Sequence, residues 1–440
     1  LHCPPADRGG IDPASTTLIV TLPNTTTGGG TIKMEAKLKY DPYFLPAAVA
    51  LIGKSAGDAT KRLNFSATSE VRLKNTLEVA LVLDNSGSMD YTGTGTGQKR
   101  ITLLKQAAKQ LVDTLSLQAE AIKQINKPVQ FGVVPFAASV NVGPSNASQS
   151  WMDLHGVSPV HYENFDMPTT EGAGIVVGTD KAIQRQADGT FLKIGSGWGA
   201  ELKTPFTRFS LYDDIKVSTG GTTTKKFMSW KGCVESRPSP DDALDTTPTP
   251  ASPQSYFVPM FAPDEWDKTK VDGINYTGLN SWWPDNNATK TQSNAGARQR
   301  NVAKYYVVGA YNYVAPDNTG ADYSCTTAPI TPLTDVSKAA GLTAVKGAID
   351  AMIPVGATNV PEGLAWGWRV VSSAAPFTEG RPEAERGNDK VVIVLTDGAN
   401  TYYPLSFFGA KDYAGSKSSY SAFGYAGQAL RGDRDKDTPL

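Results

Sequence analysis

The chain has 440 residues, of which 40% are hydrophobic, and its 42 Lys and Arg residues nearly balance its 43 Asp and Glu residues. This length exceeds one compact core and allows about three domains. The net charge of −1 gives no indication of a nucleic-acid or anionic-membrane partner. The 42 Gly and 29 Pro residues indicate a globular, loop-rich protein and exclude a fibrous one.

Residues 1–75 predict a small β-rich subdomain. A strand-like piece at 16–22 precedes a Thr- and Gly-rich spacer, and residues 31–40 and 62–74 alternate apolar with polar side chains. This alternation is typical of half-buried antiparallel strands. The apolar run at 44–52 is about half the length that spans a bilayer and is interpreted as core.

Residues 76–143 predict the first half of an α/β domain. The apolar run 77–83 is typical of a strand buried on both faces, and residues 129–136 predict a second strand. Between them, apolar residues recur every three or four positions from Arg100, which predicts an amphipathic helix. The Thr- and Gly-rich stretch 91–97 is interpreted as a mobile linker. Strand, crossover helix and strand are the repeating unit of a doubly wound, mostly parallel sheet.

Residues 144–329 lose this periodicity and predict a large insertion that splits the α/β domain. Short strand-like pieces occur at 174–177, 190–194 and 304–313. Six of the eight Trp residues lie here, which favours a folded element over a disordered one. Two interpretations remain for these Trp residues: a local core, which is the more frequent case, or an exposed surface that binds a partner.

Residues 330–440 predict the second half of the α/β domain. A helix is expected at 342–353, and a second helix opens at Pro361, where a first-turn proline is well tolerated. Along the second helix we interpret four apolar side chains as core. They are Leu364, Trp366, Trp368 and Val371. Residues 391–395 predict a strand, and no further buried strand is expected after Asp397.

Hard oxygen donors gather at three predicted loops. Asp84, Ser86 and Ser88 directly follow the strand 77–83, Asp397 follows the strand 391–395, and Thr358 precedes a helix. Asp and Ser after a strand are also common turn and N-cap residues, and this is the alternative reading of each loop alone. At the carboxyl ends of parallel strands, however, such donors make a credible Mg²⁺ site.

Three cysteines are present. We expect Cys233 to pair with Cys325, since both lie in the middle region, and closing a loop of about ninety residues stabilises a fold by roughly 4 kcal/mol. Cys3 is then free, or its partner lies in sequence missing from this chain. A zinc site is disfavoured because the three His residues lack paired ligand spacing.

The oxygen-donor loops resemble the metal-ion-dependent adhesion site of von Willebrand factor type A domains. The segments between them resemble TadG-like proteins of the bacterial tight-adherence (Tad/Flp) pilus system, and the likeness covers most of residues 30–425. The matching segments are 135–143, 151–153, 230–233, 261–265, 330–334 and 363–369.

The resemblance implies a Rossmann-like type A fold that holds Mg²⁺, with Ca²⁺ or Mn²⁺ as alternatives. The implied ligands are Asp84, Ser86, Ser88, Thr358 and Asp397. It also implies a Gram-negative periplasmic or cell-surface location, with a membrane-anchoring helix upstream of Leu1, where no initiator Met is present. Type A domains normally close with another strand and helix, which this sequence lacks, so we expect a truncated second half.

The expected function is binding and not catalysis. By analogy with adhesive type A domains, Mg²⁺ would bridge the protein to a carboxylate of another Tad component, a pilus subunit or a surface ligand. The alternative is a cell-surface adhesin whose insertion carries specificity. A metal-dependent hydrolase is disfavoured because the sequence has no Gly-x-Ser-x-Gly or His-Glu-x-x-His motif and no histidine near the metal loops.

Overall fold

The computed structural model describes residues 17–21, 31–40, 63–72, 75–120, 126–163, 165, 181–188, 190–265, 280–284, 299, 302–306, 308–315, 317–398, 400–401 and 419–425. These residues belong to two compact units. The first is drawn from segments 1–77, 122–128 and 383–389, and the second from segments 78–121, 129–382 and 390–440.

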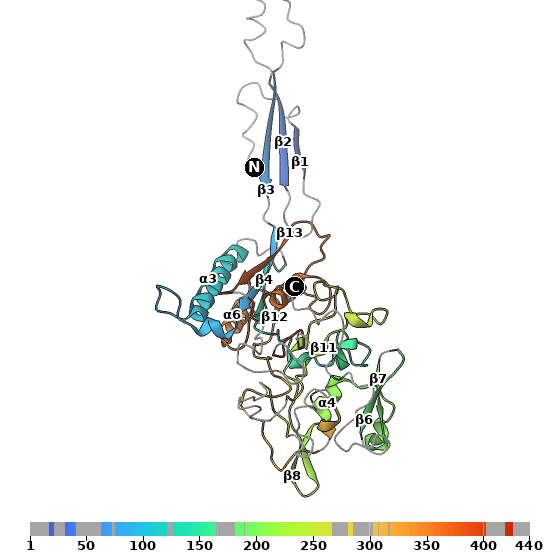
Figure 1. Ribbon diagram of the computed structural model, residues 1–440. Helices are drawn as coiled ribbons and strands as arrows, with labels where there is room; N and C mark the ends of the chain where they lie inside the picture. Colours follow the sequence, from blue (N-terminus) through green and yellow to red (C-terminus); the bar gives the residue numbers. More distant parts are fainter. Residues whose placement is uncertain are drawn as a thin grey trace, which may run out of the picture. The chain divides into compact units, whose positions relative to one another are not determined.

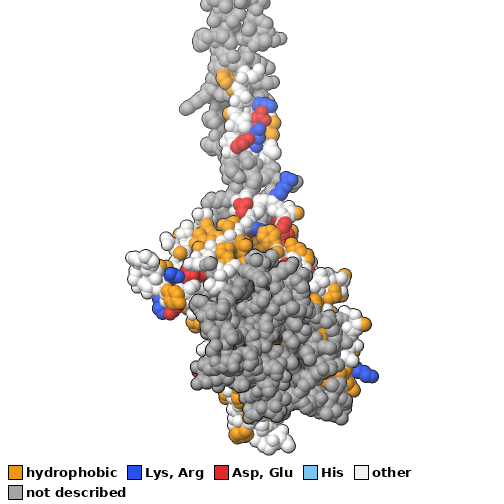
Figure 2. All heavy atoms as spheres, viewed as in Figure 1, with side chains coloured by type: hydrophobic (Ala, Val, Ile, Leu, Met, Phe, Trp, Pro, Cys, Tyr) orange, Lys and Arg blue, Asp and Glu red, His pale blue; other side chains and the backbone are white. Residues whose placement is uncertain are grey.

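The first unit contains a three-stranded antiparallel sheet of order β1-β2-β3 (Figure 1). Its strands are β1 (Thr17–Thr21), β2 (Thr31–Tyr40) and β3 (Leu63–Arg72), so the predicted strands are confirmed. Positive and negative side chains alternate along this sheet (Figure 2), and Lys33 lies 4.0 Å from Glu70. The half-burial predicted for 62–74 is wrong, because all the described side chains of β3 are exposed; those of β1 are exposed as well. The run 44–52 lies outside the described residues.

A second sheet has the order β12-β5-β4-β13. Its strands are β4 (Thr76–Asp84), β5 (Val129–Phe136), β12 (Thr331–Asp335) and β13 (Asn388–Leu395). Numbered along the chain, the four strands therefore lie in the order 3-2-1-4. Three of them coincide closely with the runs predicted at 77–83, 129–136 and 391–395.

Strand direction in this sheet follows from hydrogen bonds at the two ends of the β4–β5 pair. The Leu77 amide donates to Pro128 O at 2.9 Å, and the Asn85 amide donates to Phe136 O at 2.7 Å. Because the two bonds keep the same sequence offset, β4 and β5 run parallel. By contrast, β12 pairs with β5 in the antiparallel direction.

Three helices accompany the sheet: α3 (Arg100–Glu120), α6 (Ala339–Asp350) and α7 (Val360–Val371). Helices α3 and α6 contact each other and β5, while α7 contacts β5 and β12. Ala80 and Val82 of β4 share a core cluster with Trp366 of α7. Leu81 and Leu83 are equally buried, and alternation along the strand directs them to the opposite face. The sequence prediction that β4 is buried on both faces is therefore confirmed.

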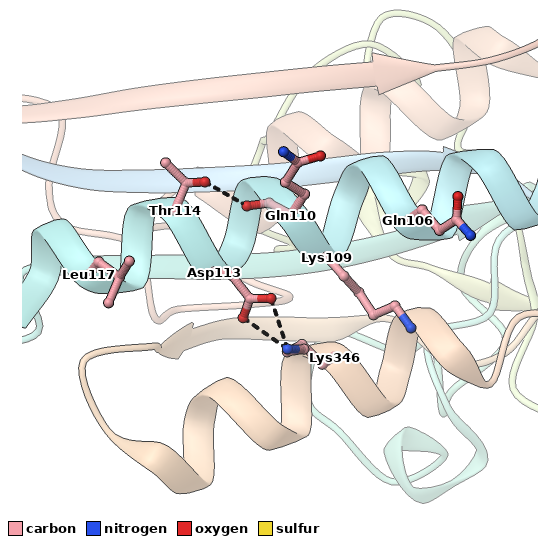
Figure 3. A pocket seen from close by; sticks show the side chains of 7 residues that line it. All are labelled: Gln106, Lys109, Gln110, Asp113, Thr114, Leu117 and Lys346. Atoms are coloured by element: carbon pink, nitrogen blue, oxygen red, sulfur yellow. Dashed lines mark hydrogen bonds and ion pairs between the residues drawn. The ribbon is translucent and has the colours of Figure 1, made fainter.

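Ion pairs join the exposed surfaces of α3 and α6. Lys346 Nζ lies 2.8 Å and 2.9 Å from the two carboxylate oxygens of Asp113 (Figure 3). Lys109 Nζ lies 2.6 Å from Asp350 Oδ1. Such pairs contribute at most about 1 kcal/mol each, since water screens them. The apolar face of α3, with Leu104, Ala108 and Val112 buried, contributes more to its attachment.

The predicted insertion 144–329 lies in the same compact unit as most of the sheet. It contains one helix, α4 (Arg208–Asp214). Three pairs of short strands also lie there: β6 (Ala182–Arg185) with β7 (Phe191–Ile194), β8 (Lys216–Gly220) with β9 (Thr223–Lys226), and β10 (Val234–Glu235) with β11 (Val258–Pro259).

Short 3₁₀ helices occur both before the insertion and within it. The one before it is Gly87–Asp90, and those within it are Pro144–Asn146, Pro159–Tyr162, Ser196–Glu201, Pro253–Ser255 and Val302–Tyr306.

The described tryptophan residues of this region form a local core and not an exposed binding surface. The five described ones are all buried; they are Trp151, Trp198, Trp230, Trp282 and Trp283. The strand expected at 304–313 is wrong, because Val302–Tyr306 forms a 3₁₀ helix that places Tyr305 in the aromatic core. The strand-like piece at 174–177 lies outside the described residues.

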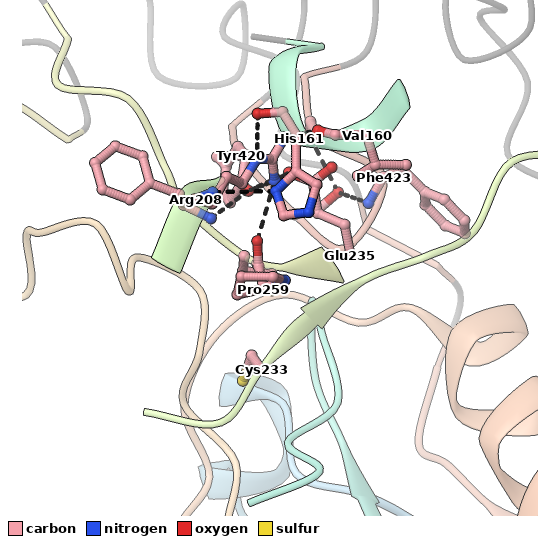
Figure 4. A network of polar contacts seen from close by, with 12 residues as sticks. Val160, His161, Arg208, Cys233, Glu235, Pro259, Tyr420 and Phe423 are labelled. Atoms are coloured by element: carbon pink, nitrogen blue, oxygen red, sulfur yellow. Dashed lines mark hydrogen bonds and ion pairs between the residues drawn. The ribbon is translucent and has the colours of Figure 1, made fainter. Parts of the chain in front are cut away.

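Two buried features stabilise the interior of the second unit. The predicted disulfide joins Cys233 to Cys325, with the sulfurs 2.00 Å apart; Cys3 lies outside the described residues. Close by, the guanidinium of Arg208 pairs with Glu235, and Tyr420 donates a hydrogen bond to the same carboxylate (Figure 4). Both charged side chains of the pair are fully buried.

Helix α7 requires a correction to the expected core. Gly363, Trp366 and Val370 share the face that contacts the sheet, and Gly367 approaches β4 and β13 on that face. Leu364 and Trp368 lie on another face and are 47% and 49% exposed, so their predicted burial is wrong. They line an open groove of about 540 Å³ together with Val392 and Phe423. In the described part of the chain, no helix combines the length and the apolarity needed to cross a bilayer.

Candidate metal centre

The loop after β4 is fixed by hydrogen bonds of its own backbone. The Ser86 amide donates to Asp84 Oδ1 at 2.8 Å, and the Gly87 amide donates to Gly356 O at 2.8 Å. Gly87 then begins the 3₁₀ helix that carries Ser88. Asp84 and Ser86 are almost fully buried, which keeps their oxygens in place.

Four of the five residues predicted as metal ligands come together in this structure. Ser86 Oγ lies 3.1 Å from Ser88 Oγ, and the Ser88 hydroxyl donates to Asp397 Oδ1 at 2.8 Å. Asp84 is linked to the same group through the Thr396 hydroxyl, which donates to Asp84 Oδ2 at 2.7 Å. Two carboxylates and two serine hydroxyls thus form one cluster where β4 and β13 end.

Thr358 lies in the loop next to this cluster. The loop touches the Ser86 turn through Gly356, and Thr358 is 3% exposed. Its backbone amide binds Thr401 Oγ1 at 3.0 Å, and its carbonyl accepts from the Thr401 amide at 3.0 Å. Among the described residues, no hydrogen bond joins its side chain to the other four, so its role as a fifth ligand stays a prediction.

The oxygen spacing fits a small divalent cation. In octahedral Mg²⁺ coordination with bonds of 2.0–2.1 Å, neighbouring ligand oxygens lie about 3 Å apart. The Ser86–Ser88 and Ser88–Asp397 oxygen separations of 3.1 Å and 2.8 Å are those of hydrogen bonds and are compatible with that edge. The donors are hard oxygens throughout, but the cluster contains only two carboxylates. Within the described residues, this cluster included, no group of three or more His, Cys, Asp or Glu side chains is arranged to hold a metal ion.

Two residues that sequence reasoning missed contribute to the cluster. Thr396 orients Asp84, and its only sequence signal is its place directly before Asp397. Arg100 Nη1 lies 2.5 Å from Asp397 Oδ2. No local signal in the sequence identified Arg100, because its carboxylate partner lies 297 positions away along the chain.

The stretch 91–97 is not the mobile linker that was expected. It folds into a closed turn in which the Gly93 amide donates to Gln98 O at 2.8 Å. Positive φ angles at Gly95 and Gly97, of 77° and 67°, are conformations that glycine adopts readily. Lys99 and Asp90 form an exposed ion pair of 2.7 Å across the turn. The Arg100 amide donates to Tyr91 O at 2.9 Å and thereby fixes the position at which α3 begins.

Comparisons with known proteins give little further information. No family model matches the chain, and no curated protein matches it. Solved structures that resemble part of it include the PilB minor pilin from Streptococcus sanguinis, with 14% identity and a TM-score of 0.14 over 29% of this chain and 31% of the pilin. Another is the pilus adhesin SpaC from Lactobacillus rhamnosus GG, with 17% identity and a TM-score of 0.12 over 29% of this chain and 11% of the adhesin. The chain thus spans a third or less of these structures, and likenesses this weak establish neither fold nor function.

Proposed function

We propose that the second unit is a von Willebrand factor type A domain that binds a partner protein through Mg²⁺, as a module of a Tad/Flp-like pilus assembly or adhesion apparatus. The observation that carries this proposal is the cluster of Asp84, Ser86, Ser88 and Asp397 at the ends of β4 and β13. The strand order 3-2-1-4 is the one with which doubly wound sheets begin and supports the fold assignment, although β12 runs antiparallel to β5 at the edge of this sheet.

The residues of the cluster have distinct roles in this proposal. Ser86 and Ser88 offer hydroxyl oxygens, and Asp84 and Asp397 offer carboxylates, with Thr358 as the fifth ligand. Bound Mg²⁺ supplies an open coordination position that accepts a carboxylate of the partner. The Ser86 amide and the Thr396 hydroxyl engage both oxygens of Asp84, which limits its rotation and preorganises the site.

The compartment follows from the same proposal. A protein of a pilus apparatus works in the periplasm or at the cell surface, where disulfides persist. The Cys233–Cys325 disulfide agrees with such a location. The partner is then another component of the apparatus, or a surface ligand, that presents an accessible carboxylate.

Thermal unfolding in EDTA, Mg²⁺ and Ca²⁺ tests the metal site. A site that binds only the folded state stabilises it by about 2.7 kcal/mol when free metal exceeds Kd a hundredfold. We expect Mg²⁺ to raise the Tm of the wild-type chain. Asp84→Asn, which keeps the size of the side chain and removes its charge, should lose this response.

Asp90→Asn is the matched control, because Asp90 lies on the same loop but pairs with Lys99 at the surface. This variant should respond to Mg²⁺ as wild type does. The proposal fails if Mg²⁺ leaves the Tm of wild type unchanged, or if Asp84→Asn responds equally.

A further inference from the structure

Arg100 is the one cationic side chain that the described structure places in direct contact with the proposed ligand set. Its Nη1 lies 2.5 Å from Asp397 Oδ2, while Asp397 Oδ1 accepts the Ser88 hydroxyl. Both oxygens of this carboxylate are therefore engaged by protein groups. A ligand that approaches Asp397 must displace or share these contacts.

The backbone and side chain of Arg100 are held differently. Its amide donates to Tyr91 O at 2.9 Å, which fixes the first residue of α3. Its guanidinium lies 5.9 Å from the centroid of the Tyr91 ring. The Arg100 side chain is 36% exposed, whereas that of Asp397 is 10% exposed. The guanidinium can therefore move into water without unfolding the helix, while Asp397 stays in place.

We propose that Arg100 is an intramolecular cation that competes with the divalent metal for Asp397, so that metal binding is coupled to release of the guanidinium. This inference rests on the proposed function. The two carboxylates and the guanidinium leave the cluster with a single net negative charge. Without Arg100 the cluster would carry two negative charges, and its affinity for a divalent cation would rise.

At low metal concentration this competition leaves Asp397 paired with Arg100. The pair with Arg100 partly neutralises Asp397 and limits the repulsion between the two carboxylates. With a divalent cation at the cluster, the Arg100 guanidinium would be repelled and would leave Asp397 for water. Arg100 thereby sets the concentration of Mg²⁺ at which the site becomes competent to bind a partner.

Calorimetric titration of the full chain with MgCl₂ tests this inference. We expect Arg100→Gln to bind Mg²⁺ roughly tenfold more tightly than wild type, because one nearby positive charge is removed from a partly exposed site. Arg100→Lys, which keeps the charge, should stay within about threefold of wild type.

Lys99→Gln is the matched control, since it removes the neighbouring positive charge, which pairs with Asp90 and not with Asp397. It should change the affinity by less than about twofold. The inference is overturned if Arg100→Gln binds Mg²⁺ no more tightly than wild type, or if Lys99→Gln gives the same gain.

A second measurement checks the same coupling through stability. In EDTA, Arg100→Gln should melt below wild type, because two carboxylates are then left without a counter-charge, and saturating Mg²⁺ should close this gap. A gap that persists in Mg²⁺ would contradict competition.

The outcomes separate this inference from the proposed function. If wild type binds Mg²⁺, Asp84→Asn does not, and Arg100→Gln binds with the affinity of wild type, only this inference fails. If no variant binds Mg²⁺, the proposed function fails with it.

Discussion

Replacing Glu235 with Ala is expected to lower the free energy of unfolding of the second unit by about 3–5 kcal/mol, which is typical of breaking a buried ion pair. Arg208 Nη1 lies 2.5 Å from Glu235 Oε1, and neither side chain is accessible to water. Removing the carboxylate leaves a buried guanidinium without its counter-charge (Figure 4).

The surroundings of this pair explain why it cannot relax at low cost. Burial is the largest single influence and lowers the pKa of Arg208, but Glu235 acts together with Tyr420 and Glu163 to hold the pKa above its usual value. Burial also raises the pKa of Tyr420 well above its usual value, so the phenol stays neutral and donates to Glu235. The guanidinium further binds His161 O at 3.1 Å through Nε and Pro259 O at 3.2 Å through Nη1. Hydrogen bonds to several different segments of the chain thus hold the Arg208 side chain in place.

Urea unfolding followed by tryptophan fluorescence measures the effect, since all eight Trp residues lie in segments of the second unit. Asp213→Ala is the control, because Asp213 also pairs with a basic residue, Lys226, but both side chains are exposed, at 73% and 42%. Its removal should cost at most about 1 kcal/mol. The double replacement Arg208→Met with Glu235→Leu should cost less than Glu235→Ala alone. A loss below about 1 kcal/mol for Glu235→Ala would contradict this account.

Removing the disulfide should have an effect of similar size. The chain-entropy model gives about 4.6 kcal/mol for a loop of this length, since the bridged residues are 92 positions apart. Cys233→Ala with Cys325→Ala should therefore melt well below wild type. Both sulfurs pack in a small cluster with Met260 and Tyr420, so Ala is a better replacement than a polar residue.

Unfolding scans with and without dithiothreitol complete this test. Wild type that is reduced while unfolded and then refolded should melt at the lower Tm of the double variant. The reductant should not change the Tm of the double variant. Equal Tm values for wild type and variant under oxidising conditions would show that the disulfide does not stabilise the folded state.

Much of the α/β unit follows from local pattern. The run 77–83 and the segment 129–136 are apolar and bounded by turn residues, and both form strands of the second sheet. The helix beginning at Arg100 follows from a 3.6-residue period of apolar side chains. Such signals depend on neighbours in sequence, and therefore they are readable without the fold.

Pattern was less informative where contacts between distant segments decide the outcome. Trp368 has the composition of a core residue, but helix α7 presents Gly363 and Trp366 to the sheet instead. Residues 304–313 are rich in Tyr and Val, yet packing of Tyr305 among aromatic side chains favours a 3₁₀ helix at Val302–Tyr306. Packing overrides propensity in both cases.

In the candidate site, too, local sequence pattern predicted some residues, and contacts between distant segments decided others. Asp84, Ser86 and Ser88 stand close together in the sequence, and the link to Asp397 followed from the parallel strands on which they lie. Arg100 and the buried pair of Arg208 with Glu235 could not be placed from sequence, because each depends on a partner 297 or 27 positions away. Single basic residues carry no periodic signal that identifies such a partner.

The most direct test of the central claim is an anomalous-diffraction experiment on crystals of the full chain grown with MnCl₂, in which Mn²⁺ replaces Mg²⁺. We expect one strong anomalous peak within bonding distance of Ser86 Oγ, Ser88 Oγ and a carboxylate oxygen of Asp84 or Asp397, with the Arg100 guanidinium turned away from Asp397. Crystals of Asp84→Asn grown in the same way should lack this peak. A wild-type crystal at saturating Mn²⁺ with no peak at this cluster, and with Arg100 still bound to Asp397, would contradict the account.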